Sequence, residues 1–478
     1  MIDRFIGWLA FVATLVFVSP SPLHASEIVL ACIDCYGSAA LYPVVAQQHF
    51  GEYRIRWIHV RTEKFPTKAQ LRDWEQTKHF YDHALTVDMD HPADVTRAVD
   101  FLAAAKIRRA IGGMETGAFQ SDIFNSALKL PGNDPRTGEL RRAKYPMAGA
   151  LGDLGIPTLL SGDCDEIEAF IATLESEFVV VKPNRSSGSE GLEFVHRSNL
   201  PKLRAVLKKM FAEHDKYGHP MTSVVIQPAI VGVEYVANTF RDGKKTYLLG
   251  AWRYLKVRAP GSGKLVYFLD RPVDPDSKIG RQLEALAPSI HERLGNHIGP
   301  GHAELLLEDL TKRWYVVEQA ARIAGTGVPA IEAEIWGTSH LHTNIAFSLG
   351  PEVFAKEIAK ALRVRRHDAA IFNFLALAPG AISTTGVALL ERQESYFPPF
   401  SIFRPEAESR FVETIDLATS PFVASFTGPN DVVLRNIDRM IAAQLQDDLF
   451  RYDERDCSEL LLRQGQLEQR LLDARLTY

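Results

Sequence analysis

Cysteine, an excess of one charge sign and internal repetition are all scarce in this sequence. Its 478 residues include only four cysteines, too few for a disulfide scaffold in so long a chain. Lysine and arginine number 54 against 59 acidic residues, so the basic excess that a dedicated nucleic-acid-binding protein needs is missing. The 32 glycines and 26 prolines show no period, which argues against collagen-like, solenoid and low-complexity chains.

Apolar residues are plentiful enough for several cores. They make up 46% of the chain, and at roughly 150 residues per domain the length predicts about three domains. We expect a leader at 1–26, one domain at 27–143, a second at 144–350 and a C-terminal subdomain at 351–478.

The leader combines features for and against a signal peptide. The apolar run Phe5–Val18 follows Arg4 and precedes a Ser-Pro-Ser-Pro segment, as in secretory signals, and it is too short to span a membrane comfortably. Asp3 and Leu23 depart from the usual signal pattern. Export, membrane contact through residues 1–26 and translation from an upstream start are therefore all left open.

Residues 27–143 alternate short apolar stretches with helical patterns, which predicts a parallel α/β domain. The loop Gly37-Ser38 lacks the glycine spacing of a dinucleotide fingerprint. Cys32 and Cys35 have C-x-x-C spacing, but no second ligand pair accompanies them, so a buried strand is favoured over a metal or redox site. The expected strands are 28–33, 53–60 and 109–111, and the expected helix is 39–49.

Strands and helices also mix over 144–350, where most of the chemistry-bearing residues gather. The C-terminal subdomain has few titratable clusters, so we interpret it as a support or a lid. It contains strand-like stretches at 382–390 and 422–427 and a charged helical tail from Asp431. In the central region the expected strands are 178–181, 224–226 and 314–317, and the expected helix is 201–214.

The first motif is a strand that ends in a lysine and continues into a serine- and glycine-rich loop. The apolar stretch 179–181 ends at Lys182, and the loop spans 186–191. Backbone N–H groups of such a loop can bind phosphate oxygens, because glycine adopts the required dihedrals and leaves no side chain in the way. The lysine precedes the glycines, so this is not a Walker loop, and a flexible surface hairpin is the alternative.

The second motif places two glutamates on one face of a predicted hairpin. If residues 309–313 form the turn, Glu308 pairs with Trp314 and Glu304 lies opposite Glu318. Like charges across a strand pair repel, so the arrangement favours a cation between them, and carboxylate oxygens suit Mg²⁺ or Mn²⁺. A solvated acidic face is the alternative.

The third motif lies between the other two along the chain. The apolar strand 224–226 runs into the extended segment 227–230, and Glu234 follows. Such a segment can present backbone groups to an adenine edge, and Glu234 can accept hydrogen bonds from ribose hydroxyls. The alternative is a strand and a turn without a ligand. Strand parity also places His302 and Arg322 beside the paired glutamates.

These three motifs occur in the order typical of ATP-grasp enzymes, and the sequence resembles that family. The resemblance is close over 144–322 and looser from 27 to about 445. The sequence is most similar to carboxylate–amine ligases related to L-amino acid ligases of the bacilysin synthetase type, a branch that the segments 130–133 and 141–147 also resemble. The resemblance implies an α/β (α+β) protein with the ATP-grasp fold, an N-terminal parallel α/β domain and a C-terminal lid or support subdomain.

The resemblance also implies roles for individual residues. Glu304 and Glu318 match the magnesium ligands, and Arg322 and His302 are candidates for stabilising an oxyanion, with a structural role as the alternative for His302. The residues expected to contact ATP are Lys144, Lys182, Ser186, Ser187, Gly188, Ser189, Gly191, Gln227, Pro228, Ala229, Ile230 and Glu234.

Some positions depart from the family pattern or lie outside it. Ala320 stands where many members have a further asparagine ligand, and Gln227 stands where an acidic residue is common. Arg253 and Lys256 are candidates for phosphate or carboxylate contacts, with a solvated strand face as the alternative. Glu115 is a weaker candidate for binding a substrate amino group.

The implied reaction transfers the γ-phosphoryl group of ATP to a carboxylate, and an amine then attacks the acyl phosphate. Its cofactors would be ATP and Mg²⁺ or Mn²⁺, and its partners an amino acid or similar carboxylate and an amine, with no nucleic acid. ATP dependence favours the cytoplasm, and a homodimer is left open. The alternatives are an exported or non-catalytic nucleotide-binding protein and another acyl-phosphate-forming enzyme that acts on a peptide or carrier-bound substrate.

Overall fold

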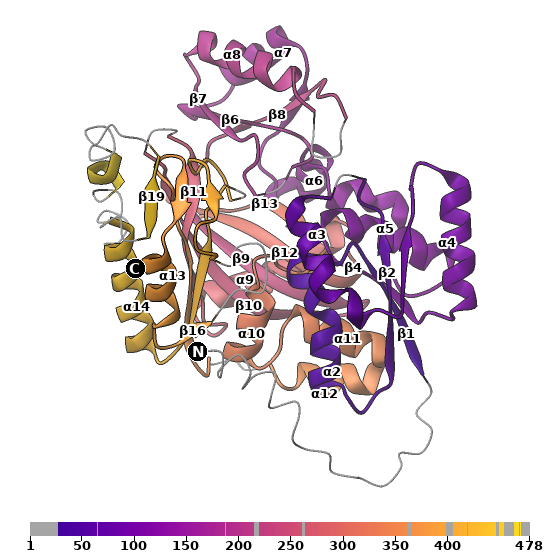
Figure 1. Cartoon of the computed structure of the whole chain (residues 1–478). Helices are drawn as coiled ribbons and strands as arrows, with labels where there is room; N and C mark the ends of the chain where they lie inside the picture. The colour runs from indigo at the N-terminus through magenta and orange to yellow at the C-terminus, as the bar shows by residue number, and fades with distance from the viewer. Residues whose placement is uncertain are drawn as a thin grey trace.

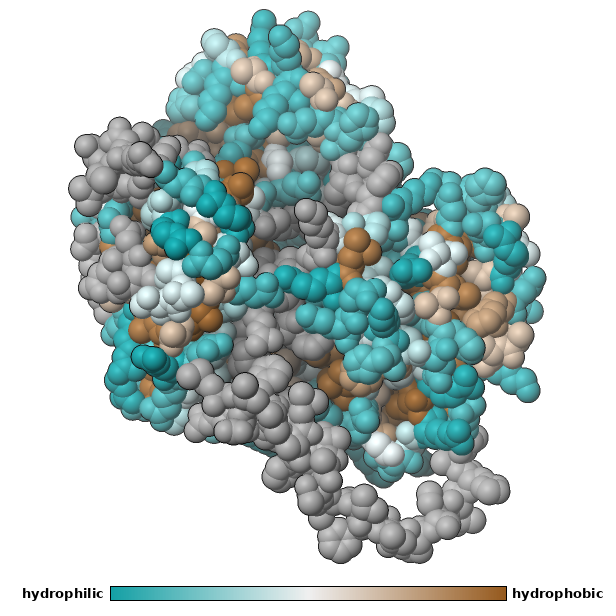
Figure 2. Space-filling model, in the orientation of Figure 1, coloured by the Kyte–Doolittle hydropathy of each residue, from teal (hydrophilic) through white to brown (hydrophobic). Residues whose placement is uncertain are grey.

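The computed structural model describes residues 27–64, 66–186, 188–214, 219–260, 263–361, 365–397, 405–417, 419–445, 449–453, 463–467 and 469. The predicted leader lies outside these ranges. Within them, no helix has the length and apolarity to cross a membrane. Figure 2 shows one face of the molecule, which is mainly hydrophilic and carries its hydrophobic residues in small separate groups.

The N-terminal region forms a parallel sheet, as the alternation of apolar and helical stretches predicts. Its strand order is β3-β2-β1-β4, so β2 and β3 lie on one side of β1 and β4 lies on the other. The strand order therefore reverses between β1 and β4. Crevices at the carboxyl ends of strands at such a point are the usual ligand sites of α/β domains. The elements are β1 (Ile28–Ile33), η1 (Gly37–Leu41), α2 (Tyr42–His49), β2 (Ile55–Arg61), α3 (Lys68–Thr77), η2 (Lys78–Phe80), β3 (His83–Thr86), α4 (Pro92–Ala104), β4 (Arg109–Gly112) and α5 (Glu115–Ala127).

A small antiparallel sheet with two helices forms a separate lobe, at the top of Figure 1. The apolar faces of both helices pack on the sheet, where Ile167, Leu203 and Leu207 are buried against Val179 and Val181. This lobe carries the predicted lysine and phosphate loop. Its strand order is β5-β8-β6-β7, with β5 (Leu159–Ser161), α7 (Cys164–Ala172), β6 (Phe178–Lys182), β7 (Glu193–His196), α8 (Leu200–Phe211) and β8 (Val224–Pro228).

An eight-stranded antiparallel sheet forms the centre of the molecule, below that lobe in Figure 1. Its strand order is β13-β12-β9-β10-β11-β14-β18-β16, so the C-terminal third of the chain extends the sheet that carries the predicted carboxylates. The strands are β9 (Gly232–Asp242), β10 (Thr246–Arg258), β11 (Leu265–Pro272), β12 (Ile298–Glu308), β13 (Trp314–Ala320), β14 (Asp368–Asn373), β16 (Tyr396–Phe397) and β18 (Val423–Gly428).

Helices cover this central sheet, and a three-stranded sheet, β17-β15-β19, lies in the C-terminal region. The helices are η3 (Pro135–Arg141), α6 (Lys144–Leu151), η4 (Gly152–Leu154), α9 (Lys278–Arg293), α10 (Val328–Trp336), α11 (His340–Leu349), α12 (Pro351–Ile358), α13 (Thr384–Glu391) and α14 (Asn430–Leu445). The short strands are β15 (Gly380–Ile382), β17 (Arg410–Phe411) and β19 (Phe450–Tyr452).

The predicted strand at 382–390 is wrong. The strand β15 ends at Ile382, and the helix α13 occupies most of the stretch. Ser383 begins this helix because its hydroxyl accepts a hydrogen bond from the backbone N–H of Gly386, an N-cap that satisfies a free helical donor. The apolar run alone did not distinguish a strand from a buried helix.

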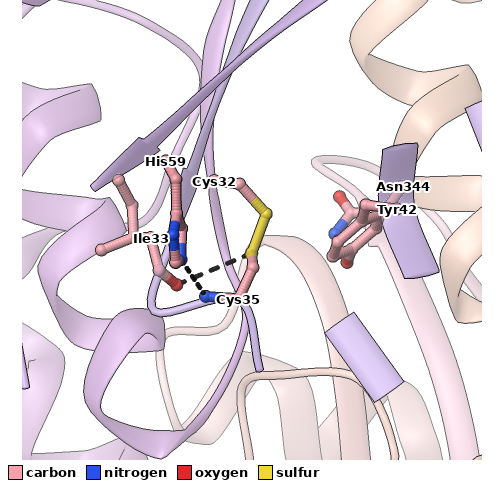
Figure 3. Close-up of a disulfide and its surroundings, with 6 residues drawn as sticks. All are labelled: Cys32, Ile33, Cys35, Tyr42, His59 and Asn344. Atoms are coloured by element: carbon pink, nitrogen blue, oxygen red, sulfur yellow. Dashed lines mark hydrogen bonds between the residues drawn. A yellow bond between two sulfur atoms is a disulfide. The ribbon is translucent and has the colours of Figure 1, made fainter. Parts of the chain in front are cut away.

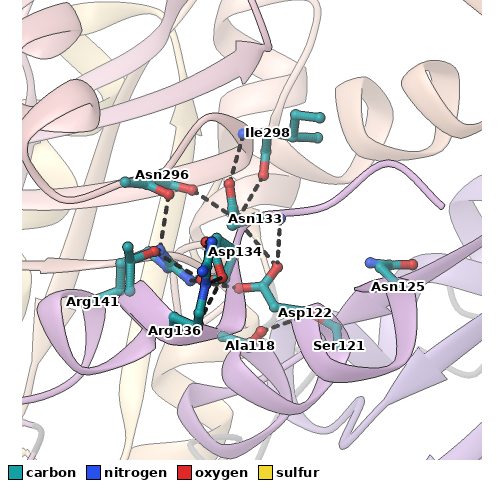
Figure 4. A network of polar contacts seen from close by, with 12 residues as sticks. Ala118, Ser121, Asp122, Asn125, Asn133, Asp134, Arg136, Arg141, Asn296 and Ile298 are labelled. Carbon is teal, nitrogen blue, oxygen red and sulfur yellow. Dashed lines mark hydrogen bonds and ion pairs between the residues drawn. The ribbon is translucent and has the colours of Figure 1, made fainter. Parts of the chain in front are cut away.

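A buried polar network joins the parallel domain to the central sheet (Figure 4). Arg141 donates a hydrogen bond to Asp122 at 2.9 Å, and both side chains are buried. Asn133 donates to the carbonyl of Ile298, at the start of β12, and to Asn296. These contacts hold α5 and η3 in a fixed position beside β12.

We expect Arg141→Met to destabilise the protein by about 3–5 kcal/mol, because it leaves the Asp122 carboxylate buried without its cation. Burial already raises the pKa of Asp122. Urea denaturation would measure the loss. Arg136→Met is the matched control, since its ion pair with Asp134 lies at the surface and should contribute little to stability. Equal losses in both variants would contradict the role of the buried pair.

Cys32 and Cys35 form a disulfide at the end of β1 (Figure 3). The buried strand expected here is confirmed, and the pairing is a feature that the spacing alone did not establish. Both cysteines are buried, and the backbone N–H of Cys35 donates to Nε2 of His59 at 3.2 Å. The disulfide therefore closes the turn that leads from β1 to η1.

This pairing makes a direct chemical prediction. Alkylation of the denatured protein without reductant should label Cys164, which is a free thiol, and leave Cys32 and Cys35 unlabelled. Reduction before alkylation should add two labels to the peptide that contains both cysteines. Peptide mass spectrometry measures the labels, and labelling of Cys32 or Cys35 without reductant would contradict the disulfide.

Candidate active site

Strands β12 and β13 place the two predicted carboxylates directly opposite each other. Glu304 pairs with Glu318 in the register, as the sequence predicts. The predicted pairing of Glu308 with Trp314 is wrong, because Trp314 lies opposite Leu307. A bulge after Glu304 shifts the register by one residue between the turn and the carboxylates. The two side chains share one face of the sheet.

Two lysines from different elements approach these carboxylates. Lys144 begins α6, and its Nζ lies 3.0 Å from Oε2 of Glu318 and donates to the carbonyl of Ser186 at 2.7 Å. Lys182 is the last residue of β6, where the strand delivers it into the same cleft. Burial first, and then the charge of Lys144, lower the pKa of Lys182 to about 8. Both ammonium groups are buried.

The serine- and glycine-rich loop covers the cleft from the side of the small lobe. Gly188 and Gly191 have φ angles of +64° and +67°, which glycine adopts without strain. Ser189 has a φ of +66°, so consecutive residues of this turn are left-handed. Ser186, Gly188 and Ser189 line the cleft and Gly191 does not, while Ser187 lies outside the described residues.

The cleft brings together most of the predicted phosphate and metal residues. Its walls come from the small lobe, from α6 and from the central sheet, so three distant segments of the chain converge on it. The lining residues are Lys144, Lys182, Ser186, Gly188, Ser189, Glu190, Leu192, Lys256, Tyr267, His302, Glu304, Val317, Glu318, Ala320 and Arg322.

The segment predicted to bind adenine lies outside this lining. The amide of Gln227 is buried, and its Nε2 donates to the hydroxyl of Thr158 at 2.8 Å. The backbone of Ala229 is already engaged, because its N–H donates to Phe178 and its carbonyl accepts from Ser176. Pro228 ends β8, and Ile230 connects it to β9. The lining of this cleft therefore includes none of residues 227–230.

Glu234 is likewise absent from the lining, although it forms a buried ion pair with Lys256, which does line the cleft. Nζ of Lys256 lies 2.7 Å from one carboxylate oxygen and 2.8 Å from the other. Burial lowers the pKa of Lys256, but the charges of Glu234 and Glu304 outweigh it and raise the pKa overall. The sequence left two alternatives for Lys256, a contact with phosphate or carboxylate groups and a solvated strand face. Lys256 lines the cleft, so the solvated strand face is wrong.

Tyr267 is a cleft residue that the sequence reasoning missed. It lies on β11 directly opposite Lys256, whose ammonium is 4.2 Å from the centre of its ring. Its hydroxyl donates to Oε1 of Glu304 at 3.4 Å. The only sequence signal is the apolar run 265–269, which does not reveal the partner strand.

Arg322 connects the central sheet to the parallel domain. Its guanidinium donates to Oε1 of Glu115 through Nε at 2.7 Å and Nη2 at 2.6 Å. Glu115 begins α5, at the carboxyl end of the parallel sheet. This ion pair therefore holds a carboxylate of the N-terminal domain next to a residue that lines the cleft. His302 also lines the cleft, with Nε2 3.8 Å from Oε1 of Glu304.

The donor set fits a hard divalent cation that shares its ligands with phosphate. Within the described ranges, no three histidine, cysteine or acidic residues gather closely enough to hold a metal by themselves. Two carboxylates side by side, next to lysines suited to phosphate, match the preference of Mg²⁺ for a few carboxylates completed by phosphate oxygens and water.

Comparison with known proteins defines the class to which this architecture corresponds. No family model matches the sequence. The structure is similar to an L-amino acid ligase from Bacillus licheniformis, with a TM-score of 0.67, 17% identity and coverage of 90% of this chain and 100% of that one. It is also similar to the N5-carboxyaminoimidazole synthetase of Staphylococcus aureus complexed with ADP, with a TM-score of 0.60, 12% identity and coverage of 88% and 99%.

The chain shares the fold of these two enzymes, and the ATP-grasp fold that the sequence predicts is confirmed. The predicted resemblance to L-amino acid ligases is confirmed as well. In sequence, the chain is 24% identical over 353 residues to dapdiamide A synthase of Enterobacter agglomerans. This match covers 72% of this chain and 81% of that protein.

Proposed function

We propose that this protein is an ATP-dependent carboxylate–amine ligase that forms an amide bond between an amino acid, or a similar carboxylate, and an amine. The observation that carries the proposal is the pair Glu304 and Glu318, which face each other in a cleft that also holds Lys144 and Lys182. The similarity to an L-amino acid ligase and to dapdiamide A synthase supports the same reaction class.

In the proposed reaction a carboxylate oxygen attacks the γ-phosphorus of ATP, and ADP leaves. The amine nitrogen then attacks the acyl carbon of the acyl phosphate, and phosphate leaves. Two anions must first meet, so the charges of Lys144 and Lys182 are needed to offset their repulsion. At 4 Å a unit-charge contact is worth about 1 kcal/mol in water and about 4 kcal/mol at an effective dielectric near 20, so a closed loop strengthens these contacts.

Glu304 and Glu318 would hold Mg²⁺, which supplies positive charge between the phosphates and the attacking carboxylate. The loop at 186–191 would offer its backbone N–H groups to the phosphates. Arg322, held by Glu115, would donate to the oxyanion that forms when the amine attacks. The roles of Lys144, Lys182, Gln227 to Ile230 and Glu234 in binding ATP remain part of this proposal.

The compartment that fits this reaction is the cytoplasm, because it supplies ATP. The disulfide between Cys32 and Cys35 is more typical of oxidising compartments, but both sulfur atoms are buried in the core. Cell fractionation would decide, and recovery of the protein outside the cytoplasm would contradict the cytoplasmic assignment.

Incubation of the purified protein with ATP, Mg²⁺ and pooled amino acids tests the function. We expect ADP release that depends on an amino acid pair, and a product whose mass equals the two substrates minus water. A product that contains a peptide or a carrier group would instead identify a different acyl acceptor. No pair-dependent ADP release from folded protein would contradict the proposal.

A further inference from the structure

A glutamate that the proposed reaction does not use directly is buried behind the cleft. Glu332 lies on α10 and is fully buried. Its Oε1 accepts hydrogen bonds from Nδ2 of Asn238 at 2.7 Å and from Nε1 of Trp252 at 3.0 Å. Its Oε2 has no hydrogen-bond partner among the described residues. Gly250 provides the space, because a Cβ there would stand 2.1 Å from Oε1.

These contacts lead to the cleft through Asn238. Oδ1 of Asn238 lies 2.7 Å from Nδ1 of His302, which lines the cleft. Both residues are buried and lie opposite each other on the paired strands β9 and β12. Glu332, Asn238 and His302 therefore form one continuous chain of hydrogen bonds from α10 to the cleft.

The chemistry of the groups gives this chain a fixed direction. The ring N–H of Trp252 can only donate, so Oε1 of Glu332 acts as an acceptor. The amide of Asn238 must then turn its NH₂ group toward Glu332 and its oxygen toward His302. Since that oxygen can only accept, Nδ1 of His302 carries the hydrogen. Nε2 is the ring nitrogen left to face the cleft, and at 3.8 Å it is not hydrogen-bonded to Glu304.

We infer that Glu332 is a positioning residue of the proposed ligase, which acts through Asn238 to hold His302 with Nδ1 as donor and Nε2 directed at the reactants. The inference rests on the proposed function in one respect, namely that the groups facing Nε2 are the reactants of the ligase. It also explains why a carboxyl group is buried on α10, a helix whose residues Ile331, Ile335 and Trp336 belong to a hydrophobic core. Burial raises the pKa of Glu332 to about 7, so the position is costly for a merely structural residue.

The hydrogen on His302 can be observed in the wild-type protein. The ¹⁵N spectrum of histidine-labelled protein with MgADP bound, assigned with a His302→Ala sample, reports which ring nitrogen is protonated. We expect a hydrogen on Nδ1 of His302. A bare Nδ1 would overturn the inference. This measurement needs no turnover, so it remains decisive even if no amino acid pair supports ADP release and the proposed function fails.

A double-mutant cycle tests whether Glu332 acts through His302. We expect Glu332→Met to lower kcat about tenfold or more, with the dissociation constant of MgADP changed less than twofold. In the His302→Ala background the same substitution should change kcat by less than about twofold, because its target is gone. Equal fold-losses in both backgrounds would show a merely structural role and overturn the inference.

Two further variants control for folding. Glu332→Gln keeps an acceptor oxygen for Asn238 and Trp252, so it should restore most of the activity that Glu332→Met loses. Glu334→Gln changes an acidic residue on the same helix whose side chain is half exposed, and it should leave kcat unchanged. If Glu332→Met does not fold, the ¹⁵N measurement on the wild-type protein decides alone.

Discussion

Glu318→Gln should lower the kcat of amino-acid-dependent ADP release by about 10²- to 10³-fold. Glutamine has the same size but carries no charge, so one of the two carboxylates proposed to hold Mg²⁺ is lost. The substitution also removes the ion pair that holds Lys144 at 3.0 Å. This loss leaves the buried ammonium of Lys144 without its carboxylate, so we expect a variant that folds with a somewhat lowered melting temperature.

The matched control for this prediction is Glu308→Gln on the same hairpin. Glu308 lies near the turn, where its carboxylate accepts from Thr311, and it is absent from the cleft lining. ADP release should stay within about twofold of the wild-type rate in this control. Comparable losses in both variants, or full activity in Glu318→Gln, would contradict the assignment of Glu318.

Lys182→Met should weaken MgATP binding about 10- to 100-fold, because it removes a buried charge from the proposed phosphate site. Methionine fills a similar space, and a buried charge is costly without its ligand, so the free variant should be at least as stable as the wild type. Isothermal titration calorimetry measures the affinity and thermal unfolding the stability. Unchanged MgATP affinity in a folded variant would contradict the role of Lys182.

The lowered pKa of Lys182 also predicts a pH dependence. Because the pKa falls from 10.5 to about 8 on folding, the folded ligand-free protein binds fewer protons than the unfolded chain between these values. This lysine should therefore make the ligand-free protein more stable as pH rises from 8 to 10.5. ATP binding needs the charged form, so affinity should fall by up to about tenfold per pH unit above 8.

Lys182→Arg separates this titration from the others, since arginine stays charged throughout that range. Above pH 8, the MgATP affinity of this variant should fall much less than that of the wild type. A decline of the same size in both proteins would assign the titration to another group.

The elements that the sequence predicted well are those in which a local pattern determines the structure. The strand that ends at Lys182 follows from an apolar run, and the hairpin that pairs Glu304 with Glu318 follows from its polar turn and strand parity. Even here the register at Trp314 was wrong by one residue, because a bulge leaves no clear mark in the pattern. The error did not reach the carboxylates, since the bulge lies between them and the turn.

The residues that the sequence did not reveal depend on contacts between distant strands. Tyr267 enters the cleft because β11 lies beside β10, and nothing within 265–272 specifies that neighbour. Asn238 and Glu332 are 94 positions apart, so their hydrogen bond appears only in the folded structure. The adenine-binding role of residues 227–230 stays a prediction, and within that segment the backbone of Ala229 is bonded to Phe178 and Ser176.

A crystal structure with ADP and Mg²⁺ bound would test the central claim most directly. The account predicts that oxygens of Glu304 and Glu318 lie about 2.0–2.1 Å from a metal ion that also contacts the nucleotide phosphates. It further predicts that the ammonium groups of Lys144 and Lys182 lie within hydrogen-bond distance of those phosphates. A nucleotide bound elsewhere, or a metal ion that neither carboxylate touches, would contradict the account.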